Sequence, residues 1–211
     1  MVVSVHIPKS AGTSFRWVLQ GLYGERVWFD YGRIFHRGQA LPGIIPAGTQ
    51  CIHGHFLADA FDRLYPRRKL ITWVRHPVER VAATYHHFLR QPDMRDDCCR
   101  ALYERKLSIR EFSDLDWMCN TATRYLAAKP IGDFAFVGVV ERFDECVRRF
   151  ATEFGGSVRA IPRQNVNRER TTTHYDLPPE IFEHILSRNA ADMEWYDKAV
   201  GALTKPLEPV L

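Results

Sequence analysis

The sequence predicts an α/β protein in which a central parallel sheet is flanked by helices. Short runs of β-branched and apolar residues alternate along the chain with segments whose apolar residues recur at helical spacing. The chain has 211 residues, of which 45% are hydrophobic, and this is enough to bury one core. We therefore expect a single domain over residues 1–211, with a parallel sheet that helices cover on both faces.

The beginning of the chain predicts a strand, a loop and a helix. Residues 2–7 form a β-branched run that Pro8 ends, which indicates a buried strand. Helical spacing begins after Thr13, and Gly24 is a suitable place for the helix to end. The apolar side of this helix is formed by Phe15, Val18, Leu19 and Leu22.

The same order recurs twice further along the chain. Residues 69–74 predict a second strand, and a helix follows in which Pro77 suits the first turn, where its missing N–H is not needed. Residues 134–140 predict a third strand, and residues 143–154 place phenylalanines in helical register. Alternating strands and helices are typical of a parallel sheet.

The other segments predict helices and one long connection. Residues 30–50 are rich in Gly and Pro, which indicates an irregular segment. Residues 94–128 and 178–203 are expected to be helical. Four aromatic residues that we assign to the long loop could stack on a sugar, although packing against the domain is the simpler expectation. They are Trp28, Phe29, Tyr31 and Phe35.

Composition limits the classes of function. The net charge of +4 and the pI near 8.9 favour an anionic ligand, but the charges are dispersed and form no dense basic stripe for nucleic acid. Five cysteines without a CxxC pair indicate neither a zinc site nor a complete disulfide framework, so we expect free thiols. With no signal peptide or membrane-spanning run, we expect a cytoplasmic protein.

The segment between the first strand and the first helix predicts a phosphate site. Residues 6–15 read His-Ile-Pro-Lys-Ser-Ala-Gly-Thr-Ser-Phe, at a place where backbone N–H groups and the helix dipole converge on an anion. Small residues let the backbone wrap closely around the ligand, and Lys9 supplies a cation. The alternative is an ordinary helix start with Thr13 as N-cap. The segment is not a Walker A sequence, because Lys9 precedes Gly12.

A second anion-binding residue is expected where the second strand ends. Arg75 follows residues 69–74, and ligands of open α/β sheets bind at that edge of the sheet. A guanidinium can hold a phosphate through two parallel hydrogen bonds. The alternative for Arg75 is a salt bridge to a nearby carboxylate.

A histidine pair, His53-Gly54-His55, lies between these two motifs in the sequence and follows the short apolar pair Cys51-Ile52, where we expect a strand to end. Two histidines at this spacing point the same way in an extended chain, and the glycine leaves room for a substrate. A neutral imidazole can take a proton from a hydroxyl, and we expect a pKa near about 6.5 for His55. Two histidines are too few ligands for a catalytic metal, so we predict no metal site.

These motifs together resemble those of sulfotransferases that use 3'-phosphoadenosine-5'-phosphosulfate (PAPS), in particular the branch that includes heparan sulfate 2-O-sulfotransferases and bacterial relatives. The resemblance implies a P-loop-like sheet. It also implies that Lys9 approaches the bridging oxygen between phosphate and sulfur, and that the loop holds the 5'-phosphate. The loop residues are Lys9, Ser10, Ala11, Gly12, Thr13 and Ser14. In His-Gly-His the second histidine, His55, would be the base, with His53 as its helper.

For the 3'-phosphate, the family uses a strand-ending arginine and a serine eight residues later. Arg75 matches the arginine, but Ala83 stands at the serine position and Thr84 is its neighbour. Further resemblance covers Val137–Phe143, read as architectural, and the stretch Asn165–Arg168, whose Arg168 is assigned to the cofactor. Three arginines in this polar part of the chain could form a lid over the cofactor or an anionic acceptor, and the alternative is a solvated basic loop. The lid arginines are Arg163, Arg168 and Arg170.

The resemblance implies an enzyme that transfers a sulfuryl group from PAPS to a hydroxyl, most simply on a saccharide, and releases 3'-phosphoadenosine-5'-phosphate (PAP). Two alternatives are a small-molecule kinase of the P-loop type and a non-catalytic protein that binds anionic polymers. A kinase would need Mg²⁺ ligands and a Walker lysine, and we find neither in the expected place. Glu79 is an alternative to His55 as the base.

Overall fold

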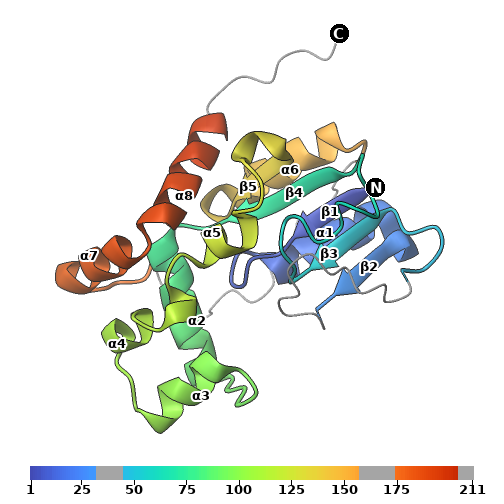
Figure 1. The fold of residues 1–211 in the computed structure, drawn as a ribbon. Helices are drawn as coiled ribbons and strands as arrows, with labels where there is room; N and C mark the ends of the chain where they lie inside the picture. The colour runs from blue at the N-terminus through green and yellow to red at the C-terminus, as the bar shows by residue number, and fades with distance from the viewer. Residues whose placement is uncertain (32–44, 157–173, 204–211) are drawn as a thin grey trace.

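The structure is a computed structural model that describes residues 1–31, 45–156 and 174–203. The centre of this part of the chain is a five-stranded sheet with the order β2-β3-β1-β4-β5, in which every pair of neighbours is parallel (Figure 1). The strands are β1 (Val2–Val5), β2 (Val27–Asp30), β3 (Cys51–Gly54), β4 (Lys69–Val74) and β5 (Phe134–Val139). The predicted α/β fold with a central parallel sheet is confirmed.

Helices cover both faces of this sheet. The α-helices are α1 (Gly12–Tyr23), α2 (Pro77–Arg90), α3 (Asp97–Glu104), α4 (Ile109–Ser113), α5 (Thr121–Leu126), α6 (Phe143–Glu153), α7 (Pro179–Arg188) and α8 (Ala190–Leu203). On one face α1 meets α6, where the rings of Phe15 and Phe150 lie 5.1 Å apart. On the other face α8 packs against β4 and β5, and α5 packs against α8 (Figure 1). Within the described ranges, no helix has the length and apolar composition needed to cross a membrane.

One strand was not predicted. We assigned Trp28 and Phe29 to an irregular connection, but they belong to β2, which pairs with β3 at the edge of the sheet. Three of the four β2 residues are only half-buried, and a strand this short carries too little periodicity to be recognised. Most of the predicted long connection lies outside the described residues, including Phe35.

The topology has a switch point beside the central strand β1. The chain leaves β1 towards β2 on one side of the sheet, whereas it leaves the neighbouring strand β4 towards β5 on the other side. Ligands of open α/β sheets bind where the connections of two adjacent strands diverge in this way. The carboxyl ends of β1 and β4 carry Lys9 and Arg75, so both predicted cationic residues lie at this point.

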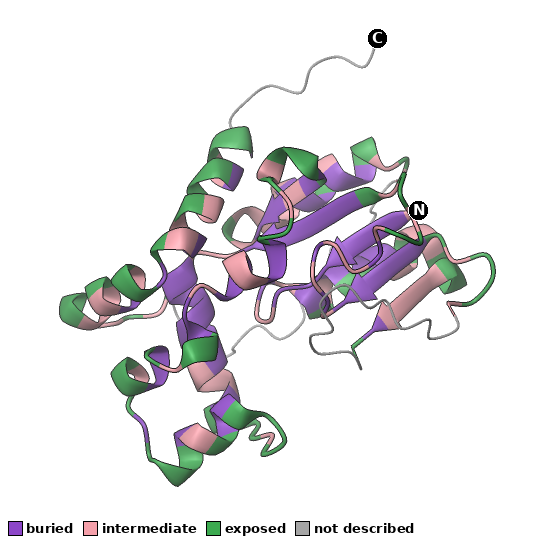
Figure 2. Ribbon diagram, viewed as in Figure 1, coloured by how far each residue is buried: buried purple, intermediate pink, exposed green. Residues whose placement is uncertain are grey.

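Two hydrophobic clusters hold the elements together. The larger one contains the sheet and the inner faces of α1, α5, α6 and α8, and Figure 2 shows that the strands β1, β3 and β4 are almost wholly buried. The smaller one joins α2 to α3, α4 and α7, away from the sheet. Because α2 begins at the sheet and ends in the smaller cluster, it connects the two.

Candidate active site

The loop after β1 has a strained backbone. Lys9 and Ala11 have φ angles of 64° and 58°, in the left-handed region that residues with a Cβ seldom occupy. Helix α1 begins at Gly12, and its N-cap, Ala11, offers no side-chain cap. The alternative with Thr13 as N-cap is therefore wrong. Backbone strain of this kind gathers at functional sites, where the surrounding structure holds it in place.

Two further features show that this loop is closely packed. A Cβ on Gly12 would lie 2.0 Å from both Cε1 and Nε2 of His6, so only glycine fits. The Ser10 side chain is buried, and among the described residues its hydroxyl has no hydrogen-bond partner. A buried hydroxyl without a partner is costly, and an anion in the loop would give this one an acceptor.

Positive charge gathers around Lys9. Its ammonium is partly buried, and this desolvation, together with the charges of Arg75 and Arg90, lowers the pKa of Lys9 to about 8. Arg90, at the end of α2, was not among the predicted site residues. The position of Arg90 relative to Lys9 depends on the direction of α2, and this direction could not be predicted from the sequence. A site with several cations close together suits a ligand with more than one negative charge.

Arg75 joins the loop to α2. It donates from Nη1 to the Lys9 carbonyl at 3.3 Å and from Nη2 to Oε2 of Glu79 at 3.2 Å. The salt bridge that we considered as an alternative for Arg75 is therefore present. Arg75 still lies directly after β4, at the carboxyl end of that strand. Glu79 also accepts a hydrogen bond from the Tyr175 backbone at 2.8 Å, so its carboxylate holds Arg75 and a distant segment in place.

The residues assigned to the 3'-phosphate differ in how they are placed. Thr84 is buried on α2, and its hydroxyl donates to the Arg80 carbonyl at 2.9 Å, so in this arrangement the proton is engaged within the helix. Ala83, at the position of the family's serine, is also buried. Arg168 lies outside the described residues, as do Arg163 and Arg170.

The histidine pair meets a third histidine that the prediction did not assign. His6 stacks on His53, with ring centroids 5.2 Å apart, and its edge faces His55 at 4.7 Å. His53 is buried and its Nδ1 is 2.8 Å from the Ser4 hydroxyl, whereas His55 is partly exposed. The sequence analysis included His6 in the first strand and in the phosphate-site segment, but gave its side chain no role. Its contacts depend on the pairing of β1 with β3.

Gly54 has a different role from the one expected. A Cβ on Gly54 would lie 1.7 Å from the Asp30 carbonyl oxygen, and the backbone of His55 donates to that same oxygen at 3.0 Å. The glycine therefore lets β2 approach β3, rather than leaving room for a substrate. This close approach brings Tyr31 to the histidines, with its ring 5.0 Å from that of His55.

Burial keeps these histidines neutral. Desolvation lowers the pKa of His55 to about 4. Desolvation, followed by the charges of His55 and Arg16, lowers the pKa of His53 to about 3. The expected value near 6.5 for His55 is therefore wrong, because the sequence did not show how deeply the ring is enclosed. Near pH 7 both rings are therefore neutral.

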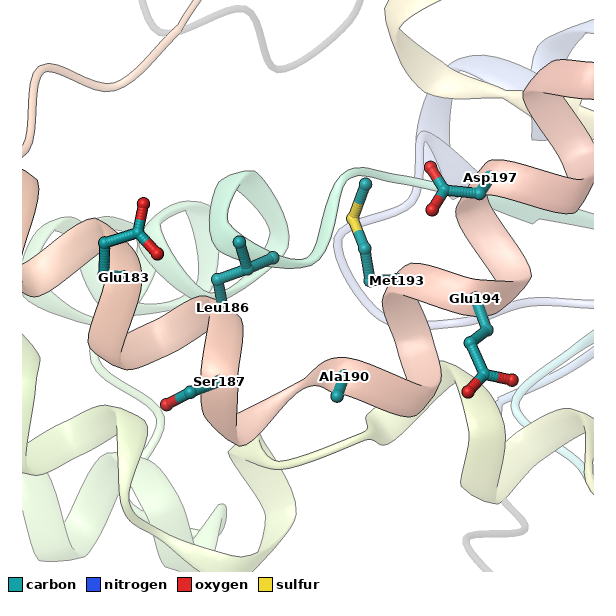
Figure 3. Close-up of a pocket in the computed structure, with 7 residues that line it drawn as sticks. All are labelled: Glu183, Leu186, Ser187, Ala190, Met193, Glu194 and Asp197. Carbon is teal, nitrogen blue, oxygen red and sulfur yellow. The ribbon is translucent and has the colours of Figure 1, made fainter.

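A separate concave surface lies between α7 and α8. Figure 3 shows its lining, and the space is about 410 Å³. The lining consists of Glu183, Leu186, Ser187, Ala190, Met193, Glu194 and Asp197. Three of these side chains are carboxylates, which repel an anionic ligand, and none belongs to the loop or the histidine cluster. We therefore place the candidate active site at the carboxyl ends of β1, β3 and β4.

Comparison with known proteins finds similarity to solved structures but not to known sequences. No protein-family model matches the sequence, and no curated protein sequence is similar to it at a significant level. The structure is similar to the crystal structure of a mouse sulfotransferase, SULT7A1, complexed with PAP, at a TM-score of 0.41 and 11% identity. That match covers 92% of this chain and 66% of the mouse chain.

A bacterial protein is more similar in structure. The match is to a sulfotransferase from Alicyclobacillus acidocaldarius, with a TM-score of 0.50 and 15% identity, and it covers 97% of this chain and 96% of that chain. The similarity therefore extends over nearly the whole of both chains, and at this identity it is a similarity of fold. The chain has the α/β fold of this bacterial sulfotransferase.

Proposed function

We propose that the protein transfers a sulfuryl group from PAPS to an acceptor hydroxyl, with residues 1–211 acting as one domain. The observation that supports this most directly is the meeting of a strained cationic loop with a neutral histidine cluster. Gly12 of the loop and His55 both contact the ring of His6. A donor held in the loop would thus have a base beside it. The fold shared with a sulfotransferase agrees with this proposal.

The residues present suit PAPS. Within the described part of the chain the Ser10 hydroxyl lacks a partner, the backbone turns sharply at Lys9 and Ala11, and Gly12 lets the His6 ring pack against the loop. Under the resemblance, Thr13 and Ser14 would contact the 5'-phosphate, and Arg75 the 3'-phosphate. Thr84 and Arg168 remain proposals for the same ligand. When bound, PAPS supplies the sulfuryl group, whose bond to a phosphate oxygen breaks as the acceptor oxygen bonds to sulfur.

Each of two side chains has a separate part in this reaction. His55 takes the proton that the acceptor hydroxyl loses, and burial keeps the imidazole in the neutral form that can do so. Lys9 holds positive charge near the oxygen that gains negative charge, which stabilises the transition state more than the ground state. His53 is buried and stacks on His6, which suits a helper that orients the histidine cluster.

Glu79 is less suited to act as the base. Its carboxylate is buried and interacts with Arg75 and with the backbone of Tyr175. A base must be able to approach the acceptor, whereas these contacts tie the Glu79 carboxylate to Arg75 and to the Tyr175 backbone. We assign it to holding Arg75 in position.

A saccharide acceptor is supported by Tyr31. Tyr31 is 37% exposed and its ring lies 5.0 Å from that of His55, so a partly exposed aromatic ring lies next to the proposed base. Aromatic rings can stack on the apolar face of a sugar ring. Burial raises the pKa of Tyr31 to about 12, so its hydroxyl keeps its proton and can donate a hydrogen bond to an acceptor.

Two measurements test the proposed function. Incubation with PAPS labelled in the sulfuryl group should move the label to saccharides more readily than to aliphatic alcohols. Calorimetry should show that PAP binds about 10–100-fold more tightly than AMP or ATP, because each charge-assisted hydrogen bond contributes about 1.5–3 kcal/mol. Tighter binding of ATP, or binding that requires Mg²⁺, would indicate a kinase, and binding of anionic polymers without PAP would indicate a non-catalytic protein.

A further inference from the structure

His6 lies where the first strand meets the loop. Its backbone N–H donates to the Gly54 carbonyl at 2.8 Å, which continues the pairing of β1 with β3 by one residue. The side chain is 9% exposed, so its position is set by the packing around it. This residue therefore belongs both to the end of β1 and to the start of the loop.

The His6 ring makes contacts in three directions. It stacks on His53 with an interplanar angle of 23°, and it meets His55 edge-on at 78°. On a further side it occupies the space that a Cβ on Gly12 would need. A single ring thus separates the backbone of the loop from the proposed base.

We propose that His6 is a positioning residue, whose ring sets the distance between the donor-binding loop at Gly12 and the proposed base His55. This inference rests on the proposed function. Sulfuryl transfer needs the acceptor oxygen in line with the bond that breaks, and an error of about 1 Å in such an arrangement can lower the rate about 100-fold. Because β1 contributes both His6 and the loop, one strand end determines this spacing.

The surroundings of His6 favour a role for the ring rather than for its charge. The groups that face it are Lys9 from the loop, His53 and His55 from the end of β3, and Tyr31 from the end of β2. Burial first, then His55, His53 and Lys9, lower the pKa of His6 well below its ordinary value. A ring that stays neutral contributes contact and shape, and another aromatic ring should be able to replace it.

Three variants test this role. His6→Ala should lower kcat about 10–100-fold while the Kd for PAP changes less than about 3-fold, because the loop remains and the base is displaced. His6→Phe should keep kcat within about 5-fold of wild type, since the ring contacts are retained. The matched control is His184→Gln on α7, whose side chain pairs with Asp114 at 3.0 Å, and it should behave as wild type.

The contact with Gly12 gives a test that needs no activity. Gly12→Ala should lower the Tm and weaken PAP binding, because the new Cβ collides with a buried ring. In the double variant His6→Ala/Gly12→Ala that collision is absent, so Tm and PAP binding should return towards those of His6→Ala, and kcat should stay low. Additive losses in the double variant would contradict the contact.

Each other outcome also decides the question. His6→Ala with unchanged kcat overturns the positioning role, and so does an equal loss of kcat and PAP affinity. If His6→Phe loses as much kcat as His6→Ala while both remain folded, the nitrogens of His6 matter and the ring does not. A wild-type protein that neither binds PAP nor transfers the label contradicts the proposed function itself, and the role of His6 with it.

Discussion

His55 and Lys9 show how burial can prepare two residues for opposite parts of one reaction. Desolvation favours the neutral form of both side chains, but they start from different pKa values. The pKa of His55 falls to about 4 and that of Lys9 to about 8. Between these values the imidazole is neutral and the ammonium is charged. The proposed base and the proposed cation are therefore both in their working forms around pH 7.

The pH dependence of kcat/KM tests this arrangement. We expect a plateau with an acid limb near pH 4, where His55 becomes protonated, and an alkaline limb near pH 8, where Lys9 loses its charge. Lys9→Arg should move the alkaline limb upward, because a guanidinium stays charged. His55→Ala should lower the rate about 10²–10⁴-fold and remove the acid limb.

Tryptophan fluorescence across the same pH range should show that the protein remains folded, so that the limbs report ionisation. An acid limb at about pH 6.5 would mean that the His55 ring is exposed to water rather than enclosed. A His55→Ala enzyme with the wild-type rate and pH profile would remove His55 from the mechanism.

At the scale of elements, a buried polar network joins α2, α5 and α8. Oδ1 of Asp192 accepts hydrogen bonds from the backbone and the hydroxyl of Thr123, and Oδ2 accepts from the Ala122 backbone at 3.0 Å. The same carboxylate lies 3.8 Å from Nε of Arg80, which is also buried. Asp192 thereby caps the start of α5 and balances a buried charge on α2.

Asp192→Ala should therefore destabilise the fold strongly. Removing one partner of a buried ion pair leaves the other uncompensated, and this costs about 3–5 kcal/mol. Urea unfolding should show a loss of this size. The matched control on the same helix is Glu194→Ala, whose exposed pair with Lys198 should contribute less than about 0.5 kcal/mol. A loss below about 1 kcal/mol for Asp192→Ala would show that water replaces the carboxylate.

At the scale of the whole molecule, the cysteines are distributed through both hydrophobic clusters. All five are free and buried. Cys51 and Cys146 lie in the cluster around the sheet, and Cys98 and Cys99 lie in the cluster around α2. Burial raises the pKa of Cys98 to about 12, so little reactive thiolate forms near pH 7.

A thiol titration should report the integrity of both clusters together. The cysteines of the native protein should react slowly with a thiol reagent, and all five should react rapidly in the unfolded protein. Reductant should not change the unfolding midpoint, because the cysteines form no disulfide. Rapid reaction of one or two thiols in the native state would locate a cluster that opens locally.

Local patterns in the sequence determined the parallel sheet, most of its strands and the loop after the first strand. Strong β-branched and apolar runs predicted β1, β4 and β5, and Pro77 was correctly placed in the first turn of α2. A loop was also expected between the first strand and the first helix, and the structure has a loop there, between β1 and α1. These features depend on neighbouring residues, whose preferences are visible in the sequence itself.

Tertiary structure decided what surrounds the histidines and what the charges do. The short edge strand β2 was missed because its pairing with β3 is a contact between distant segments, and Tyr31 reaches His55 through that pairing. For the same reason the sequence did not show that His6 lies against Gly12, nor that burial would lower the pKa of His55. Burial and long-range contact depend on how the whole chain packs. A pattern of neighbouring residues contains the motifs of this site, but not the distances and the desolvation that set their chemistry.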